Sequence, residues 1–416
     1  MSTEIVNTLV VGGGQAGLAM SEHLRDNGVE HLVLERDRIA ERWRTNRWDS
    51  LVANGPAWHD RFPTKEFGDI DGSGFPTKDS VTAYFEEFAD QIEAPIRCDV
   101  EVLSAQQDQS GSGFIVETTQ GTIEAANIVA ATGPFQHPVI PPVVPNDVDV
   151  LQMHSTAYRN PEQIPKGAVM VVGAGSSGSQ IADELLRSGR KVFLSVGPHD
   201  RPPRSYRGKD FCWWLGVLGK WEMKTPPAGR EHVTIAVSGA YGGHTVDFRE
   251  LAERGMNLCG MTQAYKDGTL TFAEDLATNI KDGDDNHLTL LAEADAYVTA
   301  QGLDLPLEEE AKIIRPEPEC MTNPTLSIDL AAEGISTIIW ATGFKQDFGW
   351  LKVDAFHEDG RPDHANGVSK HEGVYFLGLP WLSMRGSSFI WGVWVDAKNL
   401  GSHIANRNQT LGLRSA

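Results

Sequence analysis

The chain has 416 residues and carries 57 acidic against 36 basic side chains, which gives a formal net charge of −21. Such a charge disfavours nonspecific binding to nucleic acid or to anionic membranes, because both would repel the protein. The length allows about two or three domains with buried cores. Residues 1–4 carry no basic leader, and no apolar run approaches the ~18 residues of a membrane-spanning helix. We therefore expect a cytoplasmic protein whose partners include neither nucleic acid nor membrane.

A glycine-rich turn near the start of the chain organises the first half of the sequence. Residues 8–11 form an apolar run that ends at Gly12, and Gly14 and Gly17 follow at the spacing of a dinucleotide-binding loop. Gly12 allows a tight turn, and Gly14 lets the backbone approach a pyrophosphate at the N-terminus of the next helix. Gly17 lets that helix pack closely on the strand. The pattern predicts a strand, a phosphate loop and a helix.

The next predicted strand, residues 32–35, ends in a carboxylate. Glu35 can accept hydrogen bonds from both hydroxyls of a ribose, which completes a nucleotide-binding unit. A glycine-rich turn that binds nothing is the alternative, and the complete set of strand, loop, helix and acid disfavours it. The candidate cofactor-binding residues of this first site are Gly12, Gly14, Gln15, Gly17, Glu35, Arg36, Trp43, Trp48, Val102, Ala131, Thr132 and Gly133.

The four cysteines, Cys98, Cys212, Cys259 and Cys320, are scattered along the chain. They form no CxxC pair and have no zinc-like spacing with histidine, so we expect free thiols and no metal site. A disulfide reductase with two nucleotide sites needs a redox-active cysteine pair. The sequence therefore disfavours that large class of enzymes.

Between residues 39 and 63 the sequence is irregular and rich in tryptophan. A long irregular connection inside a compact domain often has a functional role. The alternative is a surface loop whose aromatic side chains only pack it against the rest of the protein. After it, the apolar stripe of residues 77–91 predicts a helix, and alternation predicts strands at residues 96–105 and 114–118.

The opening pattern recurs in the middle of the chain. An apolar strand stops at Thr132-Gly133-Pro134, and the prolines that follow rule out a helix or a central strand, so we place a domain boundary near residues 134–150. Beyond it, residues 168–172 predict a strand and residues 173–178 a second phosphate loop. Two complete units in one chain argue against coincidence.

The second unit lacks the acid of the first. Its second strand ends in Ser195, at the place that Glu35 holds in the first unit, and three arginines follow. Guanidinium groups suit a ribose 2′-phosphate that a carboxylate would repel, so we predict NADPH rather than NADH; solvated loop charges are the alternative. The candidate residues of this second site are Gly173, Gly175, Ser176, Ser177, Gly178, Ser195, Arg201, Arg204, Arg207 and Thr342.

The last third of the chain returns to the first domain. Residues 337–344 repeat the strand and the Ala-Thr-Gly stop of residues 131–133, which predicts a second crossing. Before it, residues 206–324 are expected to complete the second domain, with helices at 271–280 and 288–299, and to supply walls of the substrate pocket.

We therefore predict an α/β fold with two Rossmann-like dinucleotide-binding domains. Residues 1–140 and 343–416 form one domain, and residues 150–340 form the other as an insertion.

With these motifs in place, the sequence resembles a family, the bacterial flavin-containing monooxygenases, and in particular the branch similar to CzcO-like flavoproteins and the plant YUCCA enzymes. The resemblance rests on both glycine loops and both Ala-Thr-Gly crossings. Residues 153–158 also resemble the end of the family's FxGxxxHxxxY signature, with His154 and Tyr158 in place. Val148 and Val150 stand where the signature has phenylalanine and glycine.

The resemblance implies that the first domain binds FAD and the inserted domain NADPH. It further implies hydride transfer to FAD, formation of a C4a-(hydro)peroxyflavin and transfer of one oxygen atom to a soft nucleophile. Asn54 matches an asparagine that lies near the flavin in these enzymes, and is the candidate catalytic residue. The helix expected within residues 381–397 would place its N-terminus against the flavin pyrimidine ring.

The favoured reaction is oxygenation of nitrogen or sulfur in a small organic substrate, with dioxygen as co-substrate. Tyr158 stands where Baeyer–Villiger enzymes have a tryptophan, which favours heteroatom oxygenation. Baeyer–Villiger oxidation of a ketone and a non-oxygenating redox sensor that binds FAD and NADPH remain the alternatives. A homodimer is one option for the assembly.

Overall fold

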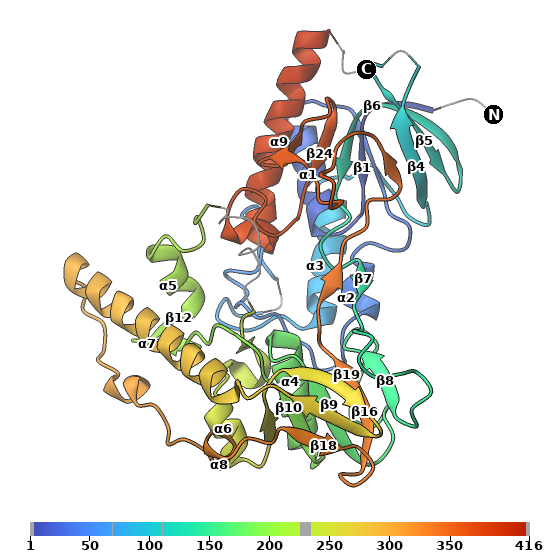
Figure 1. Ribbon diagram of the computed structural model, residues 1–416. Helices are drawn as coiled ribbons and strands as arrows, with labels where there is room; N and C mark the ends of the chain where they lie inside the picture. Colours follow the sequence, from blue (N-terminus) through green and yellow to red (C-terminus); the bar gives the residue numbers. More distant parts are fainter. Residues whose placement is uncertain (1–3, 69, 110, 225–233, 413–416) are drawn as a thin grey trace.

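The computed structural model describes residues 4–68, 70–109, 111–224 and 234–412, and it arranges them around two large sheets, one mixed and one parallel (Figure 1). Parts of the predicted ranges that fall in the gaps, such as 225–233 within the 206–324 extension, lie outside the described residues.

The first sheet combines strands from both ends of the chain. Its parallel part has the order β24-β6-β1-β2-β3, and the first half of β6 also pairs antiparallel with β5, which leads on to β4 and β21. The strands are β1 Glu4–Val11, β2 His31–Leu34, β3 Ile96–Arg97, β4 Val102–Gln107, β5 Phe114–Thr118, β6 Gly121–Ala130, β21 Leu351–Lys352, β22 His364–Ala365, β23 Val368–Ser369 and β24 Val374–Phe376. Its helices are α1 Gln15–Asp26, α2 Glu41–Thr45, α3 Lys78–Gln91, the 3-10 turn η3 Arg385–Ser388 and α9 Ile390–Leu411.

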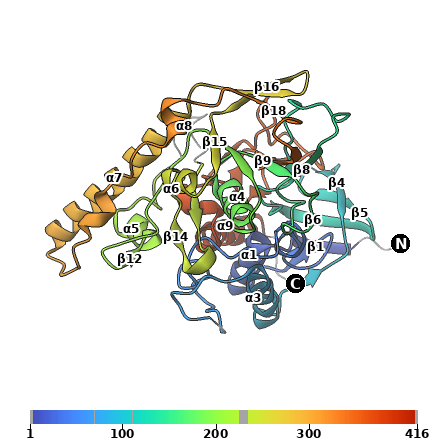
Figure 2. The same cartoon turned by 90° about the horizontal axis from the view of Figure 1, so that it is seen from below.

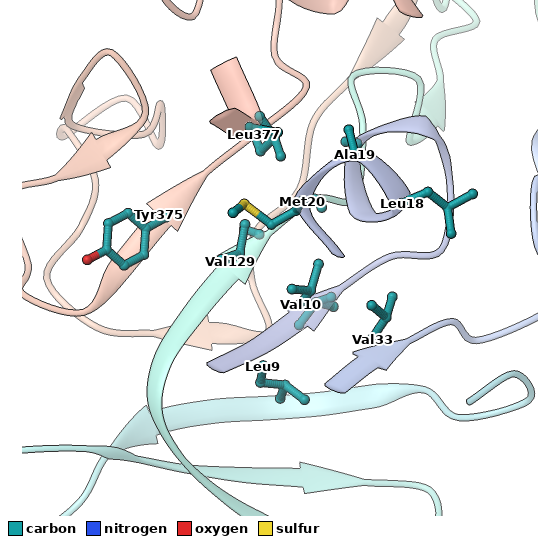
Figure 3. Packing of buried hydrophobic residues seen from close by; sticks show 14 of the residues in the cluster. Leu9, Val10, Leu18, Ala19, Met20, Val33, Val129, Tyr375 and Leu377 are labelled. Atoms are coloured by element: carbon teal, nitrogen blue, oxygen red, sulfur yellow. The ribbon is translucent and has the colours of Figure 1, made fainter. Parts of the chain in front are cut away.

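The core of this domain lies where α1 covers the central strands. Figure 3 shows Leu18 and Met20 of α1 close to Val10 of β1 and Val129 of β6, and all four side chains are fully buried. Burying each such side chain stabilises the fold by roughly 1.5–3 kcal/mol. Because α9 packs against α1, the C-terminal segment closes the same core.

The second sheet is wholly parallel, with the order β15-β10-β9-β19-β8. Its strands are β8 Leu151–His154, β9 Ala168–Val172, β10 Val192–Ser195, β15 Asn257–Cys259 and β19 Ile335–Trp340. The helices beside it are α4 Ser176–Arg187, α6 Phe248–Glu253 and α8 Glu319–Thr322, and a small antiparallel sheet contains β16 Thr262–Lys266, β17 Thr269–Phe272 and β18 Ser327–Asp329.

The extension of the second domain carries one long helix, α7 Leu276–Gln301, which projects away from the sheet in both views (Figures 1 and 2). This corrects the prediction of two helices at 271–280 and 288–299. Leu270 and Phe272 are buried while Thr269 and Thr271, which alternate with them, are half-buried, so the start of the first predicted helix is strand β17 instead. The other elements here are β11 Ser205–Tyr206, β12 Lys209–Asp210, α5 Phe211–Val217, β13 Val237–Ser238, η1 Ala240–Gly242, β14 His244–Thr245 and η2 Glu309–Lys312.

Two further differences concern the first domain and its crossings. The predicted strand 96–105 is divided, because Ile96 pairs with β2 while the residues from Val102 onward pair with β5. The two crossings lie side by side as the antiparallel pair β7 His137–Pro138 and β20 Phe344–Lys345. Proline has no N–H to donate, and it is tolerated at Pro138 because an edge strand of a two-stranded ribbon does not need a hydrogen bond from every residue.

Candidate functional site

The first glycine loop leaves no space for side chains at two of its three positions. A Cβ on Gly12 would lie 2.6 Å from the carbonyl oxygen of Ala131, and one on Gly17 would lie 1.8 Å from that of Gly12. A Cβ on Gly14 would meet nothing within 4 Å. Gly14 also begins α1 without a side-chain cap, and the first turn of α1 holds no acidic residue. The positive end of the helix dipole therefore faces open space and suits a phosphate.

Glu35 is held against this loop. Its Oε2 accepts from the Gly13 amide at 2.6 Å and its Oε1 from the Asp37 amide at 3.0 Å. A carboxylate has about four acceptor sites, so hydroxyl groups of a ribose can still be bound. Arg36 is half-exposed in an ion pair with Asp37. Val102 lies in β4 opposite Thr118, and it is Val100 whose amide bonds the Glu35 carbonyl.

The remaining residues predicted for the first site lie at the crossing and at the start of α9. Gln136 Nε2 donates to Thr132 Oγ1 and to the carbonyl of Gly133, both at 2.9 Å. Gln15 Nε2 donates at 2.8 Å to the carbonyl of Ser388, two residues before α9 begins. The phosphate loop and the N-terminus of α9 are therefore close together.

The second glycine loop repeats the geometry of the first at its first and last glycines, whereas a Cβ on Gly175 would lie 3.1 Å from the methyl group of Thr234. A Cβ on Gly173 would lie 2.5 Å from the carbonyl oxygen of Ala341, and one on Gly178 would lie 1.8 Å from that of Gly173. Helix α4 begins after Gly175 without a side-chain cap or an acid in its first turn. Ser176 Oγ donates to the Ile235 carbonyl at 2.7 Å, and Ser177 follows it as the second residue of the helix. This end of α4 also fits a phosphate.

The strand registers correct the predicted match between Ser195 and Glu35 by one residue. Val11 pairs with Leu34 in the first sheet, and Val172 pairs with Ser195 in the second, so the counterpart of Glu35 is Val196. The Ser195 hydroxyl is buried in bonds to Gly260 and Thr262. The residue at this position is thus a fully buried valine, and no carboxylate stands where the first unit has Glu35.

The three arginines are not a free cluster, which corrects the expectation for them. Each guanidinium is buried and paired with a different carboxylate, because a buried cation without a partner would be strongly destabilising. The pairs are Arg201 with Asp284 at 2.8 Å, Arg204 with Asp210 at 2.6 Å, and Arg207 with Asp295 at 2.8 Å. Two of these pairs join the segment between β10 and β12 to α7, and the third joins it to Asp210, the N-cap of α5.

The tryptophan-rich segment docks onto the second domain. Trp48 is 5% exposed and belongs, with Leu51, to the buried cluster around α4. Trp43 is half-buried and packs against the cores of both domains. The structure thus gives Trp48 a packing role, which is the alternative weighed for this segment.

Asn54 lies where the two domains meet. Its Oδ1 accepts from Gln180 Nε2 at 2.8 Å, and its carbonyl accepts from Arg204 Nη1 at 2.7 Å. Both donors belong to the second domain, 126 and 150 positions along the chain. Sequence reasoning missed Gln180, because no local pattern links it to Asn54.

A second polar group follows on the same segment as Asn54. His59 Nδ1 lies 2.7 Å from Asp60 Oδ1, and Asp60 Oδ2 accepts from the Gly55 amide at 2.9 Å. The His59 ring lies 5.8 Å from the Trp391 ring in the first turn of α9. Among the described residues, neither His59 Nε2 nor Trp391 Nε1 has a hydrogen-bond partner, although both atoms are buried. Both nitrogens can therefore bind a polar group of a cofactor or a substrate.

Two residues of the family signature join the crossing to α4. His154 Nε2 lies 3.1 Å from the carbonyl of Gly343, and Thr342 Oγ1 donates to the carbonyl of Val139. Tyr158 donates at 2.7 Å to Glu184 of α4. In this structure, His154 therefore holds the second crossing and Tyr158 holds α4.

The four cysteines are free thiols. Burial raises the pKa of every one of them, that of Cys259 to about 12. Disulfide exchange needs a thiolate, so these thiols are poor nucleophiles at neutral pH. In the described part of the chain, no helix is both long and apolar enough to span a bilayer.

Two glycine loops of this kind, each following a parallel strand of its own sheet, are typical of proteins with two nucleotide-binding domains. Residues 9–209 match the family model described as pyridine nucleotide-disulphide oxidoreductase. The chain is 34% identical to an uncharacterized CzcO-like oxidoreductase of Geobacillus kaustophilus, over 97% of this chain and 99% of the relative. It is 31% identical to the indole-3-pyruvate monooxygenase YUCCA1 of Oryza sativa, over 93% of this chain and 89% of the relative.

Among solved structures, a flavin-containing monooxygenase from Stenotrophomonas maltophilia has a TM-score of 0.66 at 18% identity, over 97% of this chain and 99% of that one. This likeness is one of fold. The chain belongs to the flavin-containing monooxygenase family, together with its CzcO-like and YUCCA relatives. The predicted family and fold class are confirmed, and the protein is a flavin-dependent monooxygenase.

Proposed function

We propose that this protein uses NADPH and dioxygen to transfer one oxygen atom to a nitrogen or sulfur atom of a small organic substrate. The observation that carries the proposal is the contact between Asn54 and Gln180, which joins the two nucleotide domains at one amide. A side-chain amide can donate to a developing negative charge on oxygen without releasing a proton that would discharge it as peroxide.

The first domain is proposed to hold FAD and the second NADPH. The diphosphate of FAD would lie on α1 above Gly14, with its ribose on Glu35, and the diphosphate of NADPH would lie on α4 above Gly175. When bound, FAD supplies the redox chemistry, taking a hydride and activating dioxygen. The uncapped N-termini of α1 and α4 support both sites, and the open space at Gly14 supports the first.

The proposed preference for NADPH over NADH is supported by the residue after the second strand, and not by the three arginines. The counterpart of Glu35 in the second unit is the apolar Val196, so no carboxylate stands there to bind a free 2′-hydroxyl or to repel a 2′-phosphate. We expect NADPH to give the larger kcat/KM, and comparing both nucleotides in anaerobic flavin reduction tests this.

The test of the proposed function is a measurement of how NADPH oxidation divides between product and peroxide. The purified protein is supplied with NADPH, air and, in turn, a small amine, a thioether and a cyclic ketone. Oxygenation of the amine or the thioether, with peroxide falling as product rises, supports the proposal. An ester from the ketone alone would make the protein a Baeyer–Villiger enzyme, and flavin binding without NADPH turnover would make it a redox sensor.

Asn54→Ala tests the residue that carries the proposal. Loss of one preorganised donor should cost about 3 kcal/mol, roughly a hundredfold in the oxygenation step. FAD content and the rate of flavin reduction by NADPH should remain unchanged while peroxide replaces product. If the variant keeps its yield of product, Asn54 belongs to the scaffold.

A further inference from the structure

The orientation of the Gln180 amide is determined by a backbone carbonyl. Gln180 Nε2 lies 2.6 Å from the carbonyl oxygen of Val237. A carbonyl oxygen only accepts hydrogen bonds, so the group that faces it must be the NH2 end of the glutamine side chain. The usual ambiguity between the two ends of an amide is thereby removed at this position.

The same NH2 group then determines the orientation of Asn54. Gln180 Nε2 lies 2.8 Å from the Asn54 side chain, which must present its oxygen to receive the second N–H. The NH2 group of Asn54 therefore faces away from Gln180. No described residue accepts a hydrogen bond from it, so both of its N–H groups are available to a ligand.

The backbone of Asn54 is held as firmly as its side chain. Arg204 Nη1 donates to the Asn54 carbonyl at 2.7 Å, while the rest of the guanidinium binds Asp210. The rings of Phe75 and Phe211 enclose this guanidinium at 4.8 and 4.5 Å from their centres. Because the cation is paired and buried, it can move little, and neither can the carbonyl that it binds.

The two segments also touch without intervening side chains. A Cβ on Gly239 would lie 2.1 Å from the carbonyl oxygen of Ala53, so only glycine allows this approach. Gly239 follows β13, and the preceding Ile235 carbonyl accepts from Ser176 in the first turn of α4. The helix that begins at the second glycine loop is therefore connected to Asn54 by Gln180 directly and by this segment indirectly.

We propose that Gln180 is a positioning residue, which turns the NH2 group of Asn54 toward the flavin side of the domain junction, and that Arg204 holds the backbone in support. The inference rests on the proposed function, since Asn54 must act for its orientation to matter. It also assigns a role to Arg204 in place of the predicted contact with a 2′-phosphate. The second domain thus contributes to oxygen chemistry through an amide of the first.

The test uses NADPH and dioxygen alone, because the substrate is unidentified. Holoenzyme is reduced with one equivalent of NADPH and mixed with aerated buffer, and the rate of peroxide release is followed. Gln180→Met keeps the side-chain length but removes the donor, so we expect release to accelerate about three- to tenfold, the effect of one neutral hydrogen bond. Gln180→Glu should act in the same direction, because a carboxylate accepts and would turn the Asn54 amide around.

Gln91→Met, at an exposed glutamine at the end of α3, is the matched control and should change nothing. FAD content measured for each variant excludes loss of the cofactor as the cause. Asn54→Ala and the double variant complete a cycle, in which Gln180→Met should add nothing once the amide is gone. The same cycle on unfolding midpoints of the flavin-free protein should also be non-additive, because the two side chains are bonded without any ligand.

The outcomes are distinguishable. If Asn54→Ala accelerates release but Gln180→Met does not, Gln180 has no positioning role, while the proposed function stands. If Asn54→Ala has no effect, the proposed role of Asn54 fails and the positioning role fails with it. Additive effects on peroxide release would also overturn the inference, since the two residues would then act separately.

Discussion

The two nucleotide-binding units of this protein share one backbone and differ in the residue that comes directly after the second strand. In both units the last glycine of the loop packs its Cα against the carbonyl of the first, with 1.8 Å to an imagined Cβ. The first unit then bonds the Gly13 amide to Glu35, whereas the second places Ala174 and Val196 in one buried apolar cluster. We propose that the loop geometry provides a phosphate site in each unit, and that the residue after the second strand determines which ribose each unit binds. Five substitutions test this comparison.

The largest effect is expected from the shared glycines. Gly17→Ala puts a methyl group against the Gly12 carbonyl and should abolish FAD retention, with a stability loss of roughly 3 kcal/mol. Gly178→Ala makes the same clash in the second unit and should leave FAD bound while flavin reduction by NADPH is lost. Absorbance of the purified proteins at the flavin band and anaerobic reduction separate the two results. If Gly178→Ala also lost FAD, the units would not be independent sites.

Next in size is Arg201→Met, which removes one member of a buried ion-pair group. Asp284 keeps Arg249 as a partner at 2.8 Å, so the loss should lie near the lower end of the 3–5 kcal/mol expected for breaking buried pairs, about 3 kcal/mol. Denaturant unfolding measures the stability. The ratio of kcat/KM for NADPH and NADH should be unaltered. A decrease in kcat/KM for NADPH alone would instead support the predicted contact between this arginine and the 2′-phosphate.

Glu35→Gln probes the difference between the units directly. The carboxylate accepts from the Gly13 amide at 2.6 Å and is proposed to accept from a ribose, so its neutral isostere should weaken charge-assisted hydrogen bonds. We expect the Kd for FAD to rise about 10- to 150-fold, which corresponds to about 1.5–3 kcal/mol. Fluorescence titration of the flavin-free protein gives this constant. Full occupancy of the variant after extensive dilution would place the ribose elsewhere.

The smallest effect is expected from Ser195→Ala. The hydroxyl donates to the carbonyl of Gly260 and accepts from Thr262, so its removal should cost about 1 kcal/mol of stability. Because the register places Val196 at the ribose position, the preference between NADPH and NADH should not change. Steady-state kinetics with both nucleotides check this, and a changed preference would return Ser195 to the binding site.

Much of the fold could be predicted because its signals are local. A strand, three glycines and a helix within about 25 residues identify a phosphate loop, since the glycines are demanded by contacts inside the same unit. The helix predicted at residues 77–91 was found as Lys78–Gln91, with Thr77 as its N-cap. Residues 276–280 and 288–299 of the two predicted helices were found as helix, but within the one continuous helix α7, and the predicted break between them contains Gly283. A Cβ there would lie 2.6 Å from His199, so close packing retains a glycine inside one continuous helix.

The sequence by itself determined that the chain has two nucleotide-binding units and which family it resembles, because those properties follow from short motifs with a steric reason for each glycine. Only the tertiary structure decided which side chains meet at the junction. Arg204 is buried against Asp210 and Asn54, and Gln180 reaches Asn54 across 126 positions. A hydrogen bond between distant segments leaves no periodic pattern in the chain, since its partners come together only when the two domains are packed.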